Sequence, residues 1–336
     1  MKFKYGKEFN PEDIGRKSEW KKKIADYQKD LALVQKPFTT LIQKCPVCDN
    51  TKGEIFCKIF DYNYKKCEKC NHIFSTRIVP QQRLEEYYSS LKEIKSSQGE
   101  IYLDKNIFFK RVEAIAKPKF EFVIENVKTF PSSKTWIDLG SGPGELIFYA
   151  NEKGWDATGY EIDVEAVAFA KTLNINIIES KINSNFDFEI FNKANVISLI
   201  NVLEHVVDPK SFLKKITDFT CAGTYLLMEI PHHPSLSSIV NKIFPDYSNR
   251  HIYPPDHLHI FSNESLNNMI QACNLSTEAL WYFGQDFSDL FSSLALSNKL
   301  SDDPILNEIF KLCNDLQSTI DKKRLSDTIL ILAQKV

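Results

Sequence analysis

Three glycines at alternate positions, with acidic residues on both sides, are the part of this chain most clearly suited to chemistry. The segment TWIDLGSGPGE (135–145) begins with an apolar run that reaches Asp138 and continues through Gly140, Gly142 and Gly144. Glycine permits a tight turn and lets a ligand approach the backbone closely. An apolar strand, a glycine turn and a following helix predict a nucleoside-cofactor site.

The spacing of the glycines favours a positively charged cofactor over a dinucleotide. The dinucleotide fingerprint is G-x-G-x-x-G, so its third glycine would fall on Glu145. A pyrophosphate requires a helix N-terminus without a carboxylate beside it. A second apolar run, ATGYEID (157–163), ends in the acidic residue Glu161, 17 residues after Gly144. An acid in that position is suited to bind ribose hydroxyls.

Four cysteines near the N-terminus have the spacing of a zinc site. Cys45 and Cys48 form one C-x-x-C pair, and Cys67 and Cys70 form a second pair after 18 intervening residues. Two such pairs supply four thiolates in a tetrahedral arrangement. Because four protein ligands leave no open position, we expect a structural zinc that stabilises a segment too small to fold on its own core.

Composition and charge indicate an ordinary globular protein. The 336 residues are 43% hydrophobic and 26% charged, with a net charge of −2. No stretch approaches the ~18 apolar residues of a membrane span, and the N-terminus lacks the apolar core of a secretory signal. Residues 1–44 carry eleven Lys/Arg against six Asp/Glu, which is too small an excess for a nucleic-acid surface. We therefore expect a cytoplasmic protein for which nucleic acid is an unlikely partner; the sequence does not indicate its oligomeric state.

Strand and helix patterns alternate from residue 134 onward and predict an α/β fold. The expected strands lie at 135–140, 156–163, 175–180, 195–202, 224–230, 276–283 and 327–336. Alternating βα units favour a doubly wound, mostly parallel seven-stranded sheet with helices on both faces. Before it we expect a helical and extended arm (1–40), a zinc-binding knuckle domain (41–80) and a helical connector (81–131). The α/β domain would span 132–336, with a substrate loop at 230–262.

The segment after the fifth strand concentrates histidines. Residues 229–266 are rich in proline and hold five of the seven histidines. Substrates bind on loops at the carboxyl ends of parallel strands, and histidine is a suitable general base near neutral pH. The prolines argue against a regular strand here, so spacing does not choose between His257 and His259.

The glycine loop and the acid after the second strand resemble motifs of class I S-adenosylmethionine-dependent methyltransferases. The resemblance rests on DLGSGPG (138–144), Glu161 and the fourth-strand segment LINVLEHVVDP (199–209). It implies a Rossmann-like methyltransferase fold with S-adenosylmethionine as the methyl donor. The residues that it assigns to the cofactor are Asp138, Gly140, Ser141, Gly142, Gly144, Glu161, Ile162 and Asn201.

Glu204 and His205 are similar to a metal pair in some O-methyltransferases that have an E-x-x-E-H pattern. Asn201 stands where the first Glu of that pattern should be. This departure disfavours a catalytic metal, and we expect Glu204 and His205 to brace the local helix instead.

Across about the first four-fifths of the chain, the sequence is similar to sugar C-methyltransferases. Those enzymes begin with a four-cysteine zinc domain, continue with a tyrosine-containing helix, here EEYYSS (85–90), and carry H-E-H-x-x-x-F-S, here PDHLHIFS (255–262). The resemblance assigns the general base to His257; the supporting candidates are Tyr253, Asp256 and His251. Pro254 and Pro255 depart from the family's Tyr-His, and the family's extra C-terminal domain is missing.

These resemblances imply a methyltransferase acting on a small molecule, a sugar or nucleotide sugar, in polysaccharide or secondary-metabolite synthesis. The shorter chain favours O-methylation over C-methylation. One alternative is a nucleic-acid or protein methyltransferase whose zinc domain recognises a macromolecule, which salt-sensitive RNA binding would support. The other is a non-catalytic cofactor-binding scaffold, which would bind the cofactor without turnover.

Overall fold

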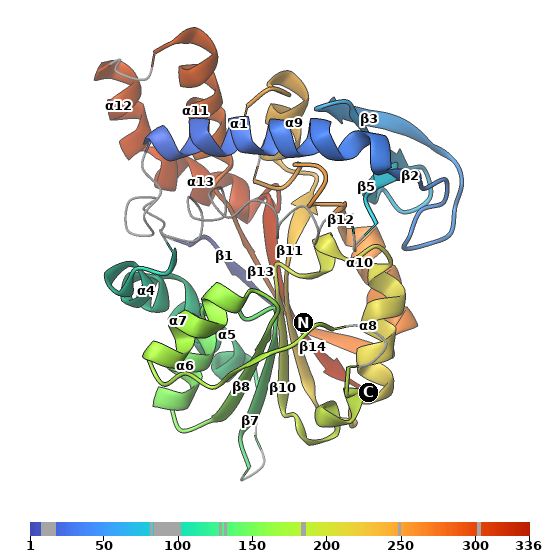
Figure 1. The fold of residues 1–336 in the computed structure, drawn as a ribbon, viewed down its shortest axis with the longest axis vertical. Helices are drawn as coiled ribbons and strands as arrows, with labels where there is room; N and C mark the ends of the chain where they lie inside the picture. Colours follow the sequence, from blue (N-terminus) through green and yellow to red (C-terminus); the bar gives the residue numbers. More distant parts are fainter. Residues whose placement is uncertain are drawn as a thin grey trace.

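The central sheet contains twelve strands, so the prediction of seven is wrong for the sheet as a whole (Figure 1). The computed structural model describes residues 1–7, 18–80, 83, 102–127, 130, 133–182, 186–247, 250–300 and 304–336. Seven strands correspond to the predicted ones, in the order β9-β8-β7-β10-β11-β14-β13. Their bounds are β7 (Thr135–Leu139), β8 (Asp156–Glu161), β9 (Ile177–Glu179), β10 (Val196–Ile200), β11 (Tyr225–His233), β13 (Leu275–Phe283) and β14 (Thr328–Lys335). Among these seven, β14 is antiparallel to both of its neighbours, β11 and β13, and all the other pairs are parallel.

The additional strands arise because β11 is longer than β10. Pairing between them stops at Ile200 and Glu229, which leaves the last residues of β11 without a partner on that side. Unpaired buried backbone groups are costly, and β12 (His259–Ser262) pairs in parallel with the end of β11. The sheet then continues through β5 (Ile73–Ser75), β4 (Tyr62–Cys67) and β3 (Gly53–Ile59). At the opposite edge, β1 (Lys2–Tyr5) pairs with β13.

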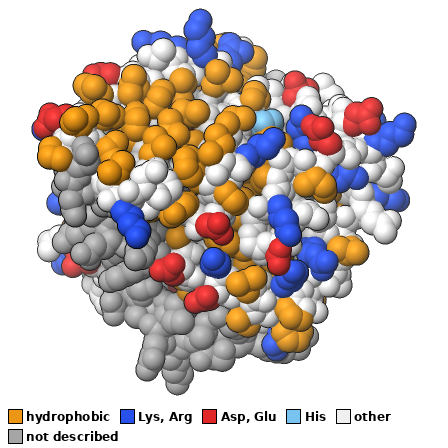
Figure 2. Space-filling view, turned by 90° about the horizontal axis from the view of Figure 1, so that it is seen from above, with side chains coloured by type: hydrophobic (Ala, Val, Ile, Leu, Met, Phe, Trp, Pro, Cys, Tyr) orange, Lys and Arg blue, Asp and Glu red, His pale blue; other side chains and the backbone are white. Residues whose placement is uncertain are grey.

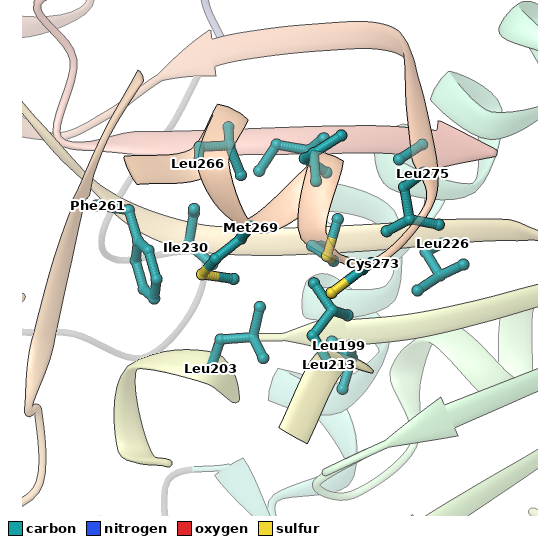
Figure 3. Close-up of a cluster of buried hydrophobic side chains, with 14 of the residues drawn as sticks. Leu199, Leu203, Leu213, Leu226, Ile230, Phe261, Leu266, Met269, Cys273 and Leu275 are labelled. Carbon is teal, nitrogen blue, oxygen red and sulfur yellow. The ribbon is translucent and has the colours of Figure 1, made fainter. Parts of the chain in front are cut away.

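Helices cover both faces of the sheet, as the alternation predicts. One face is covered by α4 (Lys105–Arg111), η3 (Val112–Ala116), α5 (Lys117–Asn126), α6 (Glu145–Glu152) and α7 (Val164–Thr172). The other is covered by η4 (Phe188–Lys193), α8 (Pro209–Asp218) and α10 (Asn263–Ala272). On that second face, leucines of β10 and β11 pack against α8 and α10 (Figure 3). The labelled side chains there are Leu199, Leu203, Leu213, Leu226, Ile230, Phe261, Leu266, Met269, Cys273 and Leu275.

Residues 105–126, in the described part of the predicted connector, form a single helix with a π turn in its middle. α4, η3 and α5 follow one another without a break, and η3 is the π turn. Pro118 is the second residue of α5. Proline cannot donate the usual helical hydrogen bond, and a π turn accommodates such a break. Residues 85–90, the expected tyrosine-containing helix, lie outside the described residues.

The remaining elements include the helices in the upper part of the molecule in Figure 1. They are α1 (Ser18–Gln35), η2 (Lys36–Phe38), β2 (Thr40–Leu41), β6 (Arg77–Ile78), η5 (Leu203–His205), α9 (Leu236–Ile243), α11 (Asp286–Asn298), α12 (Pro304–Lys311) and α13 (Cys313–Lys322). Seen from above, hydrophobic side chains gather on one part of this face (Figure 2). None of the helices in the described ranges is long and apolar enough to cross a bilayer.

Candidate active site

A cavity of about 410 Å³ lies at the carboxyl ends of β7, β10 and β11. It is lined by residues from both motifs that the sequence singles out, the glycine loop and the histidine-rich segment. The predicted site residues on its wall are Asp138, Gly140, Ser141, Gly142, Asn201, His251, Tyr253 and His257. The fold therefore brings the expected cofactor loop and the expected catalytic segment to one cavity.

The glycine loop is held in its shape by Glu161. The Glu161 carboxylate accepts hydrogen bonds from the backbone N–H of Gly142 (2.7 Å) and of Ile162 (2.8 Å). Gly144 has φ +92°, and a Cβ there would lie 2.6 Å from the Ile177 side chain. Only glycine fits this position, at the start of α6. Gly144, Glu161 and Ile162 are outside the cavity lining, and the Glu161 carboxylate fixes the shape of the loop.

Asp138 is a buried carboxyl on the cavity wall. It accepts a hydrogen bond from the Ser198 hydroxyl, which in turn accepts one from Trp136 Nε1 (2.8 Å). Burial raises the pKa of Asp138 to about 7, although the Ser198 hydrogen bond and the Lys119 charge oppose that rise. Ionised Asp138 is therefore costly unless a positive charge is bound beside it.

Two ion pairs on the cavity wall were not predicted from the sequence. Lys119 Nζ of α5 lies 2.7 Å from Glu229 Oε2 at the end of the β10-paired part of β11, and both side chains are buried. Arg111 of α4 pairs with Glu145 at the start of α6. The sequence can indicate Glu145, because it follows the glycine loop at the start of a predicted helix. It does not indicate Lys119 and Arg111, because they reach the cavity only through tertiary packing.

Arg250 fixes the start of the histidine-bearing segment. It lines the cavity, and its guanidinium pairs with Asp289 of α11 (3.0 Å) and with Asp327 just before β14. A planar guanidinium held by two buried carboxylates is a rigid anchor. The histidines that follow Arg250 are therefore placed by contacts to the C-terminal helices and strand.

His257 is the buried centre of an aromatic group on the cavity wall. Its ring lies 3.9 Å, centroid to centroid, from Tyr253 and 4.6 Å from His205. Burial lowers the pKa of His257 well below its usual range, so the ring is neutral. His251 also lines the cavity, whereas Asp256 is outside the lining and offers its backbone carbonyl to His205 Nδ1 (3.0 Å).

Glu204 and His205 do not act together as a helix brace. His205 contacts the carbonyl of Asp256 and lines the cavity. The Glu204 carboxylate is fully buried, and neither of its oxygens has a hydrogen-bond partner among the described residues. Bracing is therefore the wrong interpretation for Glu204.

The profile of one protein family, described as a methyltransferase domain, matches residues 111–280. The matched part contains the glycine loop, Asn201 and His257, and covers half of the chain. The chain belongs to this methyltransferase-domain family. The protein is accordingly a class I S-adenosylmethionine-dependent methyltransferase, and its sheet is mostly parallel and Rossmann-like, as the sequence predicts, although it has more strands than the predicted seven.

Solved structures related to this methyltransferase domain differ greatly from it in sequence. One is magnesium protoporphyrin IX methyltransferase from Synechocystis PCC 6803, with 10% identity over 76% of this chain and 100% of that chain, and a TM-score of 0.48. Another is an S-adenosylmethionine-dependent methyltransferase from Archaeoglobus fulgidus, with 17% identity over 69% and 100% and a TM-score of 0.42. A third is geranyl diphosphate C-methyltransferase from Streptomyces coelicolor A3(2), with 13% identity over 69% and 85% and a TM-score of 0.42. No curated protein sequence matches the chain.

The four N-terminal cysteines of the methyltransferase lie together as a zinc site requires. Cys45 Sγ is 3.6 Å from Cys70 Sγ, and Cys48 Sγ is 3.5 Å from Cys67 Sγ. A tetrahedral zinc with Zn–S bonds of ~2.3 Å separates its sulfur atoms by roughly 3.8 Å. Both pairs form the same knuckle, in which the first cysteine's carbonyl accepts from the N–H four residues later, at Asp49 or Asn71. The donor set therefore fits a structural zinc.

The segment that carries the four cysteines (residues 45–75, called the cysteine module below) contacts the strand that follows His257. The hydroxyl of Tyr64 in β4 donates to the His257 carbonyl (2.7 Å), and Ser262 Oγ donates to the Cys70 carbonyl (2.6 Å). His72 Nε2 lies 3.2 Å from His259 Nδ1. Because β5 also pairs with β12, the shape of the cysteine module and the position of His257 are coupled.

Loss of one cysteine thiolate should release the zinc and destabilise this coupled region. We expect Cys67→Ser to reduce the zinc content from one per chain to well below one and to lower the unfolding temperature, because three ligands hold zinc less tightly. Metal analysis by mass spectrometry and thermal unfolding measure both effects. The exposed Cys221 provides the control, since Cys221→Ser should keep one zinc. A wild-type protein purified without zinc would contradict the assignment.

Replacement of Asp138 should stabilise the cofactor-free protein but weaken cofactor binding. Because the folded pKa, about 7, exceeds the unfolded value of ~4, the carboxyl destabilises the fold increasingly from pH ~4 to ~7. Asp138→Asn should therefore gain stability over the wild type as the pH rises, up to roughly 4 kcal/mol at pH 8. It should also bind S-adenosylmethionine less tightly, since it lacks a charge to pair with the cationic cofactor. Urea unfolding at pH 5 and pH 8, with the exposed Asp156→Asn as control, tests the stability difference; equal gains at both pH values would contradict it.

Proposed function

We propose that this enzyme transfers a methyl group from S-adenosylmethionine to a hydroxyl oxygen of a small, sugar-like molecule bound in the 410 Å³ cavity. The observation that carries the proposal is the meeting of Asp138, Gly142 and Asn201 with His251 and His257 on one cavity wall. A cofactor on the glycine loop would then place its methyl group toward the histidines.

For the cofactor, we propose contacts from the residues that the motif names. Glu161 and the N–H of Ile162 would face the ribose, and Asp138 would lie near the positively charged methionine part. Asn201, which has φ +53° at the end of β10, would mark the boundary between cofactor and acceptor. Gly140, Ser141 and Gly144 would shape the loop so that its backbone approaches the ligand.

For the acceptor, we propose that His257 withdraws the hydroxyl proton as the oxygen attacks the methyl group. The His257 ring is neutral, as a base must be, and a positioned base contributes ~10²–10⁴-fold to rate. His251 and Tyr253 would position the acceptor, and Asp256 would act indirectly by holding His205. Displacement at the methyl carbon needs the acceptor oxygen ~3 Å away and in line with the departing sulfur.

The sugar assignment rests on sequence resemblance. PDHLHIFS (255–262) and the four-cysteine module are similar to those of sugar C-methyltransferases. The cavity supports a polar acceptor, since charged and amide side chains line it beside apolar ones. We propose the same division of the chain as in those enzymes: an arm (1–40), a zinc-knuckle domain (41–80) whose Cys45, Cys48, Cys67 and Cys70 bind structural zinc, a connector (81–131) and a methyltransferase domain (132–336) whose substrate loop is 230–262.

Replacement of His257 should abolish turnover and spare cofactor binding. With nucleotide sugars as acceptors, we expect His257→Ala to reduce the rate of S-adenosylhomocysteine formation at least ~100-fold. Its affinity for S-adenosylhomocysteine, measured by calorimetry, should change little, because the glycine loop is intact. His233→Gln is the matched control, since His233 belongs to the same segment but is outside the cavity lining.

Two other results would each favour a different function. Cofactor binding without turnover on any acceptor, together with indifference to the loss of His257, would indicate a scaffold. Methylation of RNA with salt-sensitive binding would indicate a nucleic-acid methyltransferase.

A further inference from the structure

Three side chains of the kind that bind metal ions converge beside the proposed acceptor position. Glu204 and His205 belong to η5, which follows β10, and His257 lies two residues before the short strand β12. One carboxylate oxygen and one nitrogen from each ring all lie within 4.8 Å of one another. The three residues come from two segments more than fifty positions apart, so the group exists only in the fold.

The Glu204 carboxylate is buried in a way that calls for a positive partner. It has no exposed surface, and neither oxygen accepts a hydrogen bond from any described residue. Buried carboxylates are normally paired, hydrogen-bonded or bound to a metal. The Glu204 backbone is fixed as well, since its carbonyl accepts from Leu258 N–H at 2.7 Å. Glu204 is therefore held within reach of His257, and its ionised form has no partner among the described residues.

In both histidines, Nδ1 makes the hydrogen bond to a described residue, so that Nε2 is available to a metal. His205 Nδ1 lies 3.0 Å from the Asp256 carbonyl, and His257 Nδ1 lies 3.2 Å from the His251 carbonyl. A carbonyl only accepts, so each Nδ1 carries the proton and each Nε2 keeps a lone pair. Metal-binding histidines are oriented in this way, with the second nitrogen donating to a carbonyl or carboxylate.

We propose that Glu204, His205 and His257 bind a divalent transition-metal cation, which binds an oxygen of the methyl acceptor. One carboxylate and two imidazoles suit manganese, iron, cobalt or zinc, and three protein ligands leave coordination positions open. His205 and His257 line the cavity together with Asn201, so those positions face the acceptor. The substrate class is then a hydroxyl with a second oxygen near enough to chelate.

This inference rests on the proposed function for the place of the acceptor, and it replaces the base role of His257 with that of a metal ligand. With its Nε2 bound to the cation, His257 acts as a ligand, and the cation makes the acceptor hydroxyl more acidic. The hydroxyl proton passes to water, the oxygen bonds to the methyl carbon, and the methyl–sulfur bond breaks to leave S-adenosylhomocysteine.

Manganese(II) distinguishes this site from the four-cysteine site. Thiolates select zinc, whereas carboxylate and imidazole accept manganese. We would titrate full-length protein that contains one zinc per chain, at the four cysteines, with Mn²⁺ and follow the free ion by electron paramagnetic resonance. The wild type should bind one Mn²⁺ per chain, and Glu204→Gln and His205→Gln should each bind it at least ~10-fold more weakly. Glu152→Gln, on the exposed end of α6, is the matched control and should bind as the wild type does.

Calorimetry with S-adenosylhomocysteine shows that each variant is folded. Absence of Mn²⁺ binding by the wild type up to millimolar concentration would overturn the proposal, as would wild-type affinity in Glu204→Gln. Mn²⁺ binding without turnover on any acceptor would support the cation site and overturn the assigned acceptor. Wild-type turnover by Glu204→Gln, with His257→Ala inactive, would leave His257 as a base and overturn the role of the cation.

Discussion

The pairing of β12 with the end of β11 is the constraint on which the site depends. β11 extends past the end of β10, and its backbone groups need partners in a buried setting. β12 provides them at His232 and His233, and its other edge pairs with β5 of the cysteine module. His257 lies two residues before this strand. A single run of main-chain hydrogen bonds therefore joins the cysteine module, the acceptor side of the cavity and the methyltransferase sheet.

Charge compensation is the second constraint, because the cavity wall contains several buried ionisable groups. Glu229 and Glu145 are each paired with a cation from the connector helix, Lys119 and Arg111 respectively. Asp138 has a hydroxyl donor but no direct cation. The wall thus holds paired charges where the protein supplies both partners, and a single carboxyl, Asp138, where a cationic cofactor would lie. Preorganised charges of this kind favour binding because they need no rearrangement when the ligand arrives.

The sequence predicts the local parts of this arrangement well. The seven strands of the methyltransferase sheet follow from apolar runs, and the glycine loop follows from the left-handed conformations that its turn requires. The number of strands in the whole sheet does not follow, because β1, β5 and β12 are short segments that become strands only by pairing with existing edges. The pairing of Lys119 with Glu229 joins a connector helix to a strand 110 residues later. A periodic pattern of apolar residues does not predict contacts between such distant positions.

Asn201 serves the fold at the position where the sequence departs from the metal-binding pattern of some O-methyltransferases. In the E-x-x-E-H pattern this position is a glutamate, and the asparagine in its place disfavours a metal beside Glu204 and His205. In the fold, Asn201 adopts φ +53°, a conformation that asparagine tolerates better than most residues. Its side chain donates to Glu229 Oε1 (3.3 Å), so it serves the turn that ends β10. The turn leads into η5, which carries Glu204 and His205. His257, from a distant segment, lies beside them. The ligand set that we propose therefore comes together only in the fold, whereas the sequence pattern around Asn201 disfavours a metal.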